Sequence, residues 1–218
     1  MAPPEPARLC PLCGAESPWF GCAGPRNLFA CGHCDLRFVP PTEHVSAAAE
    51  AARYCLHQNT PDNAGYVRWL SNAVAALQRH AARLGPNRRV LDFGSGPTPV
   101  LVSLLRQPGF DAVGYDPHFA PDTDLTQPFD AIVSIETFEH FRNPREDIGR
   151  VAGLLVPGGV LVVMTALHDG VPDMSRWHYA LDETHIAFYS MRTFQFIAGQ
   201  WGLSLVENDG RNVVVLAK

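Results

Sequence analysis

The sequence predicts an α/β protein in which a doubly wound, mostly parallel sheet follows a small metal-binding element. Three observations lead to this prediction. An apolar strand, a glycine turn, a helix and a second strand follow one another over residues 88–116. Two further apolar strands occur later, in the segments FDAIVSI and VLVVMTA. Four cysteines in two C-x-x-C pairs lie before all of these strands.

The composition is that of a globular protein with one main domain and a small appendage. The chain has 218 residues, 46% of them hydrophobic and 18% charged, and a net charge of −5. Sixteen arginines and one lysine stand against 22 acidic residues, which disfavours the basic face of a nucleic-acid-binding protein. No apolar run reaches the ~18–20 residues that span a bilayer, and residues 1–6 lack the pattern of a secretory signal. We therefore expect a soluble, cytoplasmic protein without a membrane partner.

The first element is the cysteine cluster. Cys10 and Cys13 form one pair, and Cys31 and Cys34 form a second. Each pair can make a tight knuckle whose backbone N–H groups face the sulfurs, and together they offer the four soft ligands that a structural Zn²⁺ prefers. The segment resembles a zinc ribbon, and metal binding would supply its folding free energy. A redox C-x-x-C pair and free thiols are the alternatives.

The charge of this element bears on its role. Residues 1–60 carry four arginines and five acidic residues, a net charge of −1, whereas a ribbon that docks on RNA or DNA is expected to be basic. We therefore expect a structural cap or one wall of a substrate site. Cys22 and Cys55 stand outside the two pairs and are expected to be ordinary thiols.

Residues 41–62 form a linker that contains a short Ala-rich helix and a polar stretch. The polar residues of this stretch are Tyr54, His57, Asn59 and Asp62. The stretch is either a lid over a ligand or a loop that satisfies its own backbone. Asp62 or Asn63 then caps an amphipathic helix, whose apolar residues recur every three or four positions as far as Leu84.

The segment VLDFGSG forms the turn that decides the class of ligand. An apolar strand ends at Asp92, and Gly94 and Gly96 lead into the next helix. Glycines at this point let a ligand approach the backbone, and Asp116, at the end of the second strand, can hold both ribose hydroxyls. A pyrophosphate-binding loop would need a glycine or alanine where this loop has proline, and an acid before the first glycine would repel the phosphates. A cationic nucleoside fits better.

The same segment resembles motif I of class I S-adenosylmethionine-dependent methyltransferases, and the acid 22 residues after Gly94 resembles their ribose-binding acid. The resemblance extends over residues 63–218 and includes the sequence Leu-x-Pro-Gly-Gly before the strand VLVVMTA. It implies a Rossmann-like methyltransferase sheet with S-adenosylmethionine as cosubstrate. The donor contacts that it implies are Asp92, Gly94, Ser95, Gly96 and Asp116. One departure is Thr98, where many members carry a third glycine.

The connection between Asp116 and the strand FDAIVSI is shorter than this resemblance requires. About 14 residues separate the two strands, and the usual helix and third strand do not both fit there at full length. We therefore expect a sheet that is truncated in its third-strand region.

The strand FDAIVSI leads directly into Glu136-Thr-Phe-Glu139-His140. This resembles the E-x-x-E-H corner of small-molecule methyltransferases such as the quinone-biosynthesis O-methyltransferases. There the corner faces donor and substrate, and some members use it with a divalent cation. The resemblance places Glu136 among the donor-binding residues. His140 is the leading candidate for a general base or a substrate-positioning group, and a histidine that caps a helix start is the alternative.

An aromatic and histidine-rich segment, residues 168–190, follows the strand VLVVMTA. In a doubly wound fold it would lie at the carboxyl edge of the sheet, where substrates bind. Its aromatic rings can supply apolar walls, and His185, His178 and Tyr179 can hold a polar nucleophile or remove its proton. A structural loop with its aromatic rings packed beneath it is the alternative.

The sequence thus predicts a zinc-ribbon-like element over residues 1–40, a linker or lid over 41–62, and a class I methyltransferase domain over 63–218. The expected reaction is methyl transfer from S-adenosylmethionine to an O, N or C nucleophile of a small molecule, with one structural Zn²⁺. One alternative is an RNA or ribosomal methyltransferase that docks through the ribbon, which a basic patch would favour. The arginines for such a patch are Arg142, Arg145, Arg150 and Arg176. Another is a non-catalytic module that binds S-adenosylmethionine.

Overall fold

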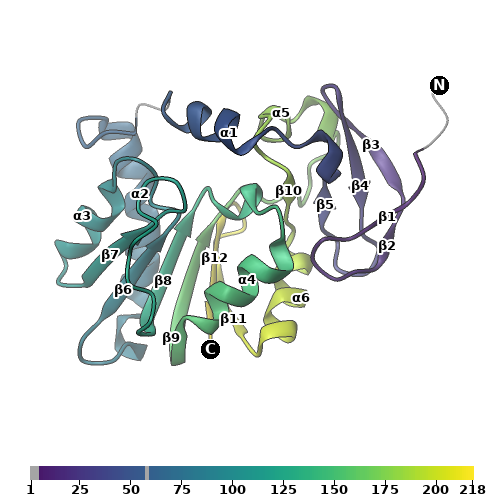
Figure 1. The fold of residues 1–218 in the computed structure, drawn as a ribbon. Helices are drawn as coiled ribbons and strands as arrows, with labels where there is room; N and C mark the ends of the chain where they lie inside the picture. Colours follow the sequence, from purple (N-terminus) through teal and green to yellow (C-terminus); the bar gives the residue numbers. More distant parts are fainter. Residues whose placement is uncertain (1–4, 57–58) are drawn as a thin grey trace.

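The computed structural model describes residues 5–56 and 59–218, and its largest sheet has six strands in the order β11-β12-β9-β8-β6-β7 (Figure 1). These strands are β6 (Arg89–Phe93), β7 (Asp111–Tyr115), β8 (Phe129–Ile135), β9 (Leu155–Met164), β11 (Ser204–Asn208) and β12 (Val213–Ala217). The strands β7, β6, β8 and β9 are parallel, and β12 lies antiparallel between β9 and β11. This arrangement confirms the predicted doubly wound, mostly parallel sheet.

The sheet is truncated in its third-strand region, as predicted. Residues 117–128, all of them described, connect β7 to β8 through turns and one isolated bridge between Asp116 and Ala120. Because no strand follows β7 on its outer side in this segment, β7 is the edge of the sheet. The short connection stays close to the carboxyl ends of β6 and β7, where the glycine turn lies.

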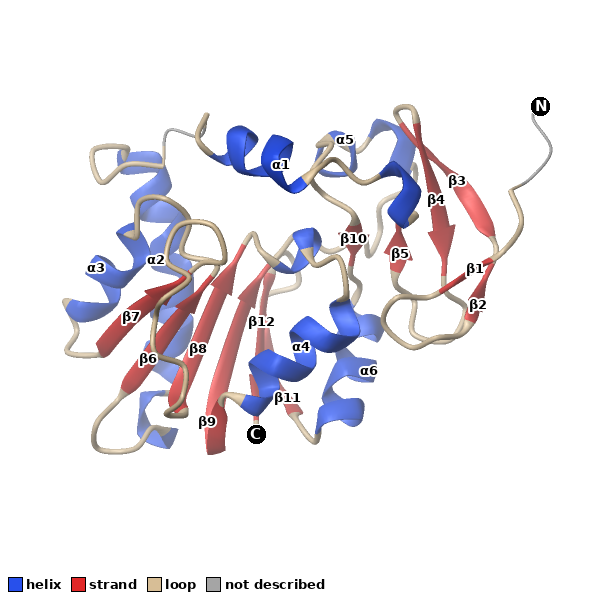
Figure 2. Cartoon of the chain, viewed as in Figure 1, coloured by secondary structure: helices blue, strands red, loops and turns tan. Residues whose placement is uncertain are grey.

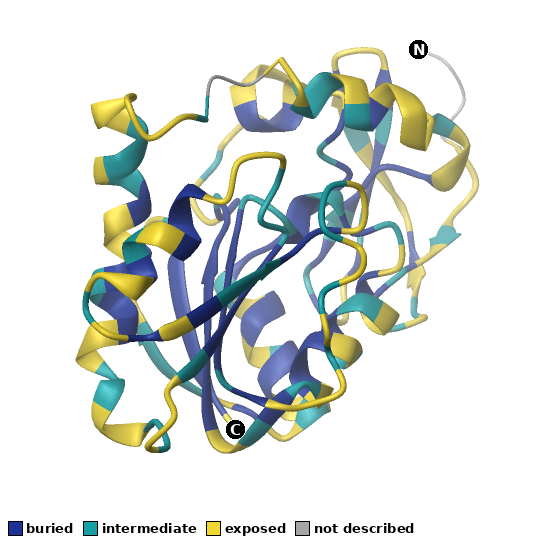
Figure 3. Ribbon diagram, turned by 60° about the vertical axis from the view of Figure 1, so that its left-hand side comes forward, coloured by how far each residue is buried: buried dark blue, intermediate teal, exposed yellow. Residues whose placement is uncertain are grey.

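Helices cover both faces of the sheet (Figure 2). α2 (Ala64–Arg79) and α3 (Val100–Arg106) pack on one face, and α4 (Pro144–Gly153) and α6 (Met191–Trp201) pack on the other. Neighbouring residues of one strand serve opposite faces, since Val90 packs with α2 and Leu91 with α4. Figure 3 shows buried strands enclosed by helices with exposed outer faces. Within the described residues, no helix has the length and apolar character to cross a membrane.

The helix after the linker is shorter than its sequence pattern predicts. Asn63 caps α2 by accepting a hydrogen bond from the Tyr66 N–H at 3.1 Å. The α-helix ends at Arg79, and a 3₁₀ helix, η2 (Ala81–Arg83), replaces the expected last turn. The His80 ring lies 2.9 Å from Glu207 of β11, so a contact with the edge of the sheet holds the chain at the point where the helix ends.

The N-terminal element is a set of short strands beside the large sheet. β1 (Arg8–Leu9) pairs with β2 (Glu16–Ser17). β3 (Trp19–Ala23), β4 (Arg26–Ala30) and β5 (Arg37–Phe38) form a second sheet, whose fourth strand is β10 (Ala187–Phe188). β10 belongs to the aromatic segment at 168–190, so the two parts of the chain share a sheet. They also share a core, in which Leu12 and Phe29 belong to the same cluster as Phe138 and Phe194.

Candidate active site

A cavity of about 700 Å³ lies at the carboxyl ends of the parallel strands. This is the place where open α/β sheets bind ligands, and the volume lies within the ~300–1,000 Å³ of small-molecule sites. The glycine turn lines one part of the cavity, and Glu136, His140 and His185 line another. Residues of α1 (Ala47–Tyr54) complete the lining. The cavity therefore joins the two regions that the sequence marks for donor and acceptor.

The glycine turn follows β6 and depends on the absence of a side chain. Gly94 and Gly96 have φ angles of +92° and +64°, which disfavour other residues. A Cβ atom added at Gly94 would overlap the side chain of Thr137. The Gly94 and Ser95 N–H groups donate to the Tyr115 carbonyl at 2.8 and 3.0 Å, and this fixes the turn against the end of β7.

Asp116 lies where the sequence places it, at the carboxyl end of β7, and lines the cavity. Its carboxylate is 6% exposed and already accepts backbone hydrogen bonds. Oδ2 accepts from the Gly96 N–H at 3.0 Å, and Oδ1 accepts from the His118 and Phe119 N–H groups at 2.8 and 3.1 Å. A carboxylate has about four lone-pair sites, so Oδ2 keeps capacity for one further donor while the backbone holds the group in place.

Asp92 is the last acidic residue before the turn, and it lies below the cavity lining. It is 3% exposed within β6. Burial, reinforced by the nearby charge of Asp116, raises the pKa of Asp92 to about 8. The carboxyl is therefore largely protonated at neutral pH, and a positive charge bound nearby would favour its ionised form.

The corner after β8 is tight and strained. Glu136 has a φ angle of +48°, which is unusual for a residue other than glycine. It lines the cavity, and burial, followed by the nearby charge of Glu139, raises its pKa to about 9. A 3₁₀ helix, η3 (Phe138–His140), comes next and turns Glu139 and His140 toward one region. Their side chains lie 3.9 Å apart, between Glu139 Oε1 and His140 Nε2.

Glu139, in the middle of η3, is the buried acid of this corner. It is fully buried, and its Oε2 accepts a hydrogen bond from the Thr165 hydroxyl at 3.0 Å. The Tyr179 hydroxyl lies 3.0 Å from Thr165 Oγ1, and it also makes hydrogen-bond contacts with the Glu136 and Glu139 carboxyls. The other oxygen, Oε1, has no hydrogen-bond partner in the part of the chain that the structure describes. Such an atom is costly to bury unless another group binds it.

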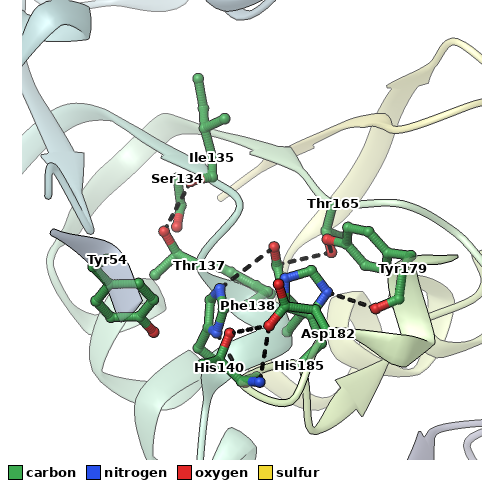
Figure 4. A network of polar contacts seen from close by, with 12 residues as sticks. Tyr54, Ser134, Ile135, Thr137, Phe138, His140, Thr165, Tyr179, Asp182 and His185 are labelled. Atoms are coloured by element: carbon green, nitrogen blue, oxygen red, sulfur yellow. Dashed lines mark hydrogen bonds and ion pairs between the residues drawn. The ribbon is translucent and has the colours of Figure 1, made fainter. Parts of the chain in front are cut away.

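His140 and His185 come from different segments and lie next to each other, as Figure 4 shows. Their ring centroids lie 4.8 Å apart. His140 Nδ1 is 2.9 Å from the Thr184 carbonyl, and His185 Nδ1 is 2.8 Å from the Tyr179 carbonyl. Because a carbonyl only accepts, both Nδ1 atoms carry a proton, and each neutral ring keeps its lone pair on Nε2. Burial lowers the pKa of His185, which favours its neutral form.

The predicted site residues divide into three groups. Those that line the cavity are Gly94, Ser95, Gly96, Asp116, Glu136, His140 and His185. Asp92 and Tyr179 are buried and do not belong to the lining, and Tyr179 contacts the lining residue Glu136 and also Thr165. His178 forms the third group alone: it is exposed at the start of α5 (His178–Leu181) and is not part of the lining. Its neighbour Tyr179 turns inward, and this turns His178 outward.

Sequence patterns did not place four charged residues in the lining, namely Glu50, Arg142, Asp147 and Arg150. Arg142 donates to the Glu50 carboxylate at 2.9 Å and to the Val45 carbonyl at 2.7 Å. The pair joins α1 to the segment after η3 across 92 positions of sequence. Tyr54, from the predicted lid stretch, also lines the cavity, whereas His57 lies outside the described residues.

The N-terminal element contacts the segment that carries His185. Arg26 of β4 is 7% exposed, and its guanidinium donates to four backbone carbonyls between residues 180 and 185 at 2.6–3.1 Å. One of these carbonyls belongs to His185. The β5–β10 pairing adds a second connection a few residues later. The N-terminal element therefore forms a wall behind one side of the cavity.

The four paired cysteines converge at the far end of this element. Their sulfurs lie within 4.8 Å of one another, with 3.6 Å between Cys10 and Cys34 and 3.4 Å between Cys13 and Cys31. A tetrahedral Zn²⁺ with ~2.3 Å bonds to sulfur needs sulfurs ~3.8 Å apart, so the set fits. A hydrogen bond from Cys34, with smaller contributions from backbone N–H groups of the knuckle, lowers the pKa of Cys10 to about 5. Cys22 and Cys55 are exposed and stand apart.

Together, the sheet order, the glycine turn and Asp116 define a class I S-adenosylmethionine-dependent methyltransferase fold. A family model described as a methyltransferase domain matches residues 66–208. The chain therefore belongs to this methyltransferase family. A comparison with curated protein sequences finds no significant match.

Three solved structures illustrate the similarity of the fold. The 1,6-didemethyltoxoflavin-N1-methyltransferase of Burkholderia thailandensis, bound to 1,6-didemethyltoxoflavin and S-adenosylhomocysteine, has a TM-score of 0.58 at 14% identity. The match covers 84% of this chain and 95% of that one. An O-methyltransferase family protein from the same organism has a TM-score of 0.55 at 18% identity, and the match covers 78% of this chain but only 62% of that one. DesVI of Streptomyces venezuelae gives 0.50 at 14% identity, over 79% and 99%. At identities of 14–18%, the similarity is evidence of a shared fold alone.

Proposed function

We propose that this chain transfers the methyl group of S-adenosylmethionine to a small molecule held beside His140 and His185. The observation that carries the proposal is the single cavity of about 700 Å³ that is lined by the glycine turn and by both histidines. Such a volume accommodates a nucleoside donor together with a compact acceptor. The donor site and the acceptor site share one space, as a direct transfer requires.

In this proposal the donor lies across the turn at Gly94 and Gly96. The open backbone of the turn lets the adenosyl group approach, and the remaining acceptor capacity of Asp116 Oδ2 is offered to a ribose hydroxyl. Asp92 and Glu136 supply negative charge near the sulfonium when they are ionised. Ser95 contributes a lining side chain between the two glycines.

The reaction needs approach and orientation more than activation, because the sulfonium is already a good leaving group. The acceptor atom forms a bond to the methyl carbon as the carbon–sulfur bond breaks. Sulfur keeps the electron pair, so S-adenosylhomocysteine leaves. An acceptor that carries a proton loses it to a base or to water, and His140 and His185, which both line the cavity, are the candidate bases.

Two observations support a small-molecule acceptor over RNA. The four arginines that could form a basic patch are mostly committed to contacts within the chain. Arg142 pairs with Glu50, Arg145 donates to the Leu12 carbonyl at 3.4 Å, and Arg150 donates to the Tyr115 hydroxyl at 2.9 Å. The ribbon is also used inward, through Arg26, as a wall of the cavity.

The same proposal covers the N-terminal element, which we assign as a zinc ribbon over residues 1–40, ahead of the linker at 41–62 and the catalytic domain at 63–218. Cys10, Cys13, Cys31 and Cys34 would hold one structural Zn²⁺, which fits the spacing of their sulfurs. The metal would stabilise strands too short to fold alone, and through Arg26 it would support the segment of His185.

Isothermal titration calorimetry tests the donor site directly. S-adenosylmethionine and S-adenosylhomocysteine should bind to the wild type. Formation of S-adenosylhomocysteine only with RNA as the acceptor would replace the small-molecule assignment, and binding without turnover of any acceptor would favour a non-catalytic module. No binding at all would refute the proposal.

A further inference from the structure

We propose that a second, smaller cavity, between the N-terminal element and the catalytic domain, binds a compact organic carboxylate. This cavity has a volume of about 180 Å³. A single water needs only ~10–15 Å³ by the same kind of measure, so the space has room for a small organic molecule. Of its lining residues, only Phe141 and Arg142 also line the larger cavity, and the proposal does not rest on the methyltransferase reaction.

The lining of the small cavity combines apolar walls with positive charge. Most of its residues are apolar, such as Phe38 of the N-terminal element and Ile186 of the catalytic domain. The other three are Arg8, His44 and Arg142, and no acidic residue is among the described residues of the lining. Apolar walls with a few polar groups are typical of small-molecule sites. Arginines without a neighbouring acid in the lining suit a ligand with a negative head group and an apolar body.

Arg8 is the first cation of this cavity. Its Nη2 donates to Glu5 Oε2 at 3.4 Å, in a contact between two exposed side chains. Its Nε atom is buried instead, and it has no hydrogen-bond partner among residues 5–56 and 59–218. A buried N–H of a charged group is costly when no acceptor reaches it. An acceptor bound in the cavity that Arg8 lines would remove this cost.

Arg142 is the second cation, and it lines both cavities. Its Nη2 uses both of its N–H groups, on the Val45 carbonyl at 2.7 Å and on the Glu50 carboxylate at 2.9 Å. A guanidinium has five N–H donors, and Nη1 and Nε make no hydrogen bond within the part of the chain that the structure describes. Glu50 therefore holds the guanidinium in place, while three N–H groups remain for a ligand.

His44 adds a polar group without a charge. Its Nε2 lies 3.0 Å from the Val39 carbonyl, so Nε2 carries the proton and Nδ1 keeps its lone pair. Burial lowers the pKa of His44, which favours the neutral ring. The positive charge of the cavity therefore comes from the two arginines. A carboxylate is a natural partner for arginine, and an organic carboxylate also fills the apolar part of the cavity.

A ligand-observed NMR titration with benzoate tests the site, because benzoate joins one carboxylate to one apolar ring. Benzoate should bind the full-length protein with a dissociation constant of about 0.1–1 mM, as expected for a ligand of this size. Benzamide has the same shape without the charge, and it should bind at least about tenfold more weakly because the arginines lose their charged partner. Inorganic phosphate at the same concentration should not displace benzoate, because the apolar walls offer it no contact.

Arg8→Gln distinguishes the small cavity from the larger one, because Arg8 lines only the small cavity. This variant should bind benzoate at least about fivefold more weakly. His185→Gln, in the lining of the larger cavity alone, and Arg211→Gln, at an exposed arginine outside both linings, should bind it as the wild type does. Thermal denaturation of each variant shows that it is folded, and benzoate should raise the Tm of the wild type more than that of Arg8→Gln.

Several results would overturn the proposal. Absence of saturable benzoate binding, equal affinity for benzamide, or displacement by phosphate would show that the cavity does not select an organic carboxylate. Unchanged affinity in Arg8→Gln, or loss of binding in His185→Gln, would place benzoate outside the small cavity.

Discussion

The described residues include two clusters of ligand-type side chains, and the two clusters are built in different ways. The cysteine cluster consists of four sulfurs that face only one another, and three of these residues are almost fully buried. The cluster of Glu139, His140 and His185 has three members, and its two histidines line an open cavity. The first arrangement is complete by itself, whereas the second leaves room for another molecule.

The contacts that hold the two clusters in place also differ, because those of the first cluster are local in sequence and those of the second are not. Short strands and tight turns within 30 residues create the cysteine cluster. The second cluster depends on contacts between the ends of β8 and β9 and the segment at 179–185. A closed cluster of local ligands suits a folding role, and an open cluster of distant ligands suits a role in ligand binding. The following experiments test this division.

The largest expected effect is that of removing a ribbon ligand. Cys34→Ser should lower the free energy of unfolding by more than about 4 kcal/mol, because the ribbon loses its metal and its core is continuous with that of the large sheet. Thermal denaturation together with zinc analysis checks this. Cys22→Ser, at an exposed cysteine outside the cluster, is the control and should behave as wild type. A folded, fully stable Cys34→Ser protein would contradict a structural role.

The second effect concerns the link between the two clusters. Arg26→Leu removes the donor of four backbone carbonyls and should cost about 3 kcal/mol of stability, since hydrogen bonds from a buried charged group contribute ~1.5–3 kcal/mol each and partial solvation offsets part of the loss. The variant should keep the zinc of the ribbon, because Arg26 is not one of the four cysteine ligands. Chemical denaturation and metal analysis measure stability and zinc content separately. Unchanged stability would show that this link does not support the segment of His185.

The smallest effect concerns Asp92, an acid that belongs to neither cluster. Its pKa in the folded protein is raised to about 8, so this group lowers stability as the pH rises from about 4, the ordinary pKa of Asp, to 8. A sulfonium nearby favours the ionised carboxylate. Binding of S-adenosylmethionine should therefore tighten between pH 6 and 9, by at most tenfold per pH unit.

S-adenosylhomocysteine lacks the sulfonium charge and provides the control for this prediction. Its affinity should change less over the same pH range, and Asp92→Asn should remove the difference between the two ligands. Calorimetry at several pH values measures both. Parallel pH profiles for the two ligands in the wild type would show that Asp92 does not sense the donor charge.

Much of the fold followed from local patterns in the sequence. The glycine turn, Asp116 and the apolar strands are each encoded within a few consecutive residues, so their places in the sheet could be predicted. The short connection after Asp116 also revealed the truncated edge, because its length alone excludes a helix and a strand. The cysteine pairs are local in the same way, and their convergence agrees with their spacing.

The candidate site was harder to predict where its parts are distant in sequence. His185 meets His140 across 45 positions because a short helix, α5, reverses the chain, and no periodic pattern encodes this reversal. The same helix exposes His178, which the sequence could not distinguish from His185. Glu50 and Arg142 pair only in three dimensions. The role of Arg26 was equally hidden, since its partners are backbone carbonyls that any sequence would supply.

The strand pairing between β5 and β10 has a consequence for biosynthesis. The N-terminal element leaves the ribosome first, yet its sheet gains its last strand only when residues 187–188 have been made. Until then Leu12, Phe29 and Leu36, which are fully buried in the finished protein, lack part of their cover. A nascent chain must therefore keep an apolar surface from aggregating through most of translation, and early capture of zinc would protect it by making the half-built element rigid.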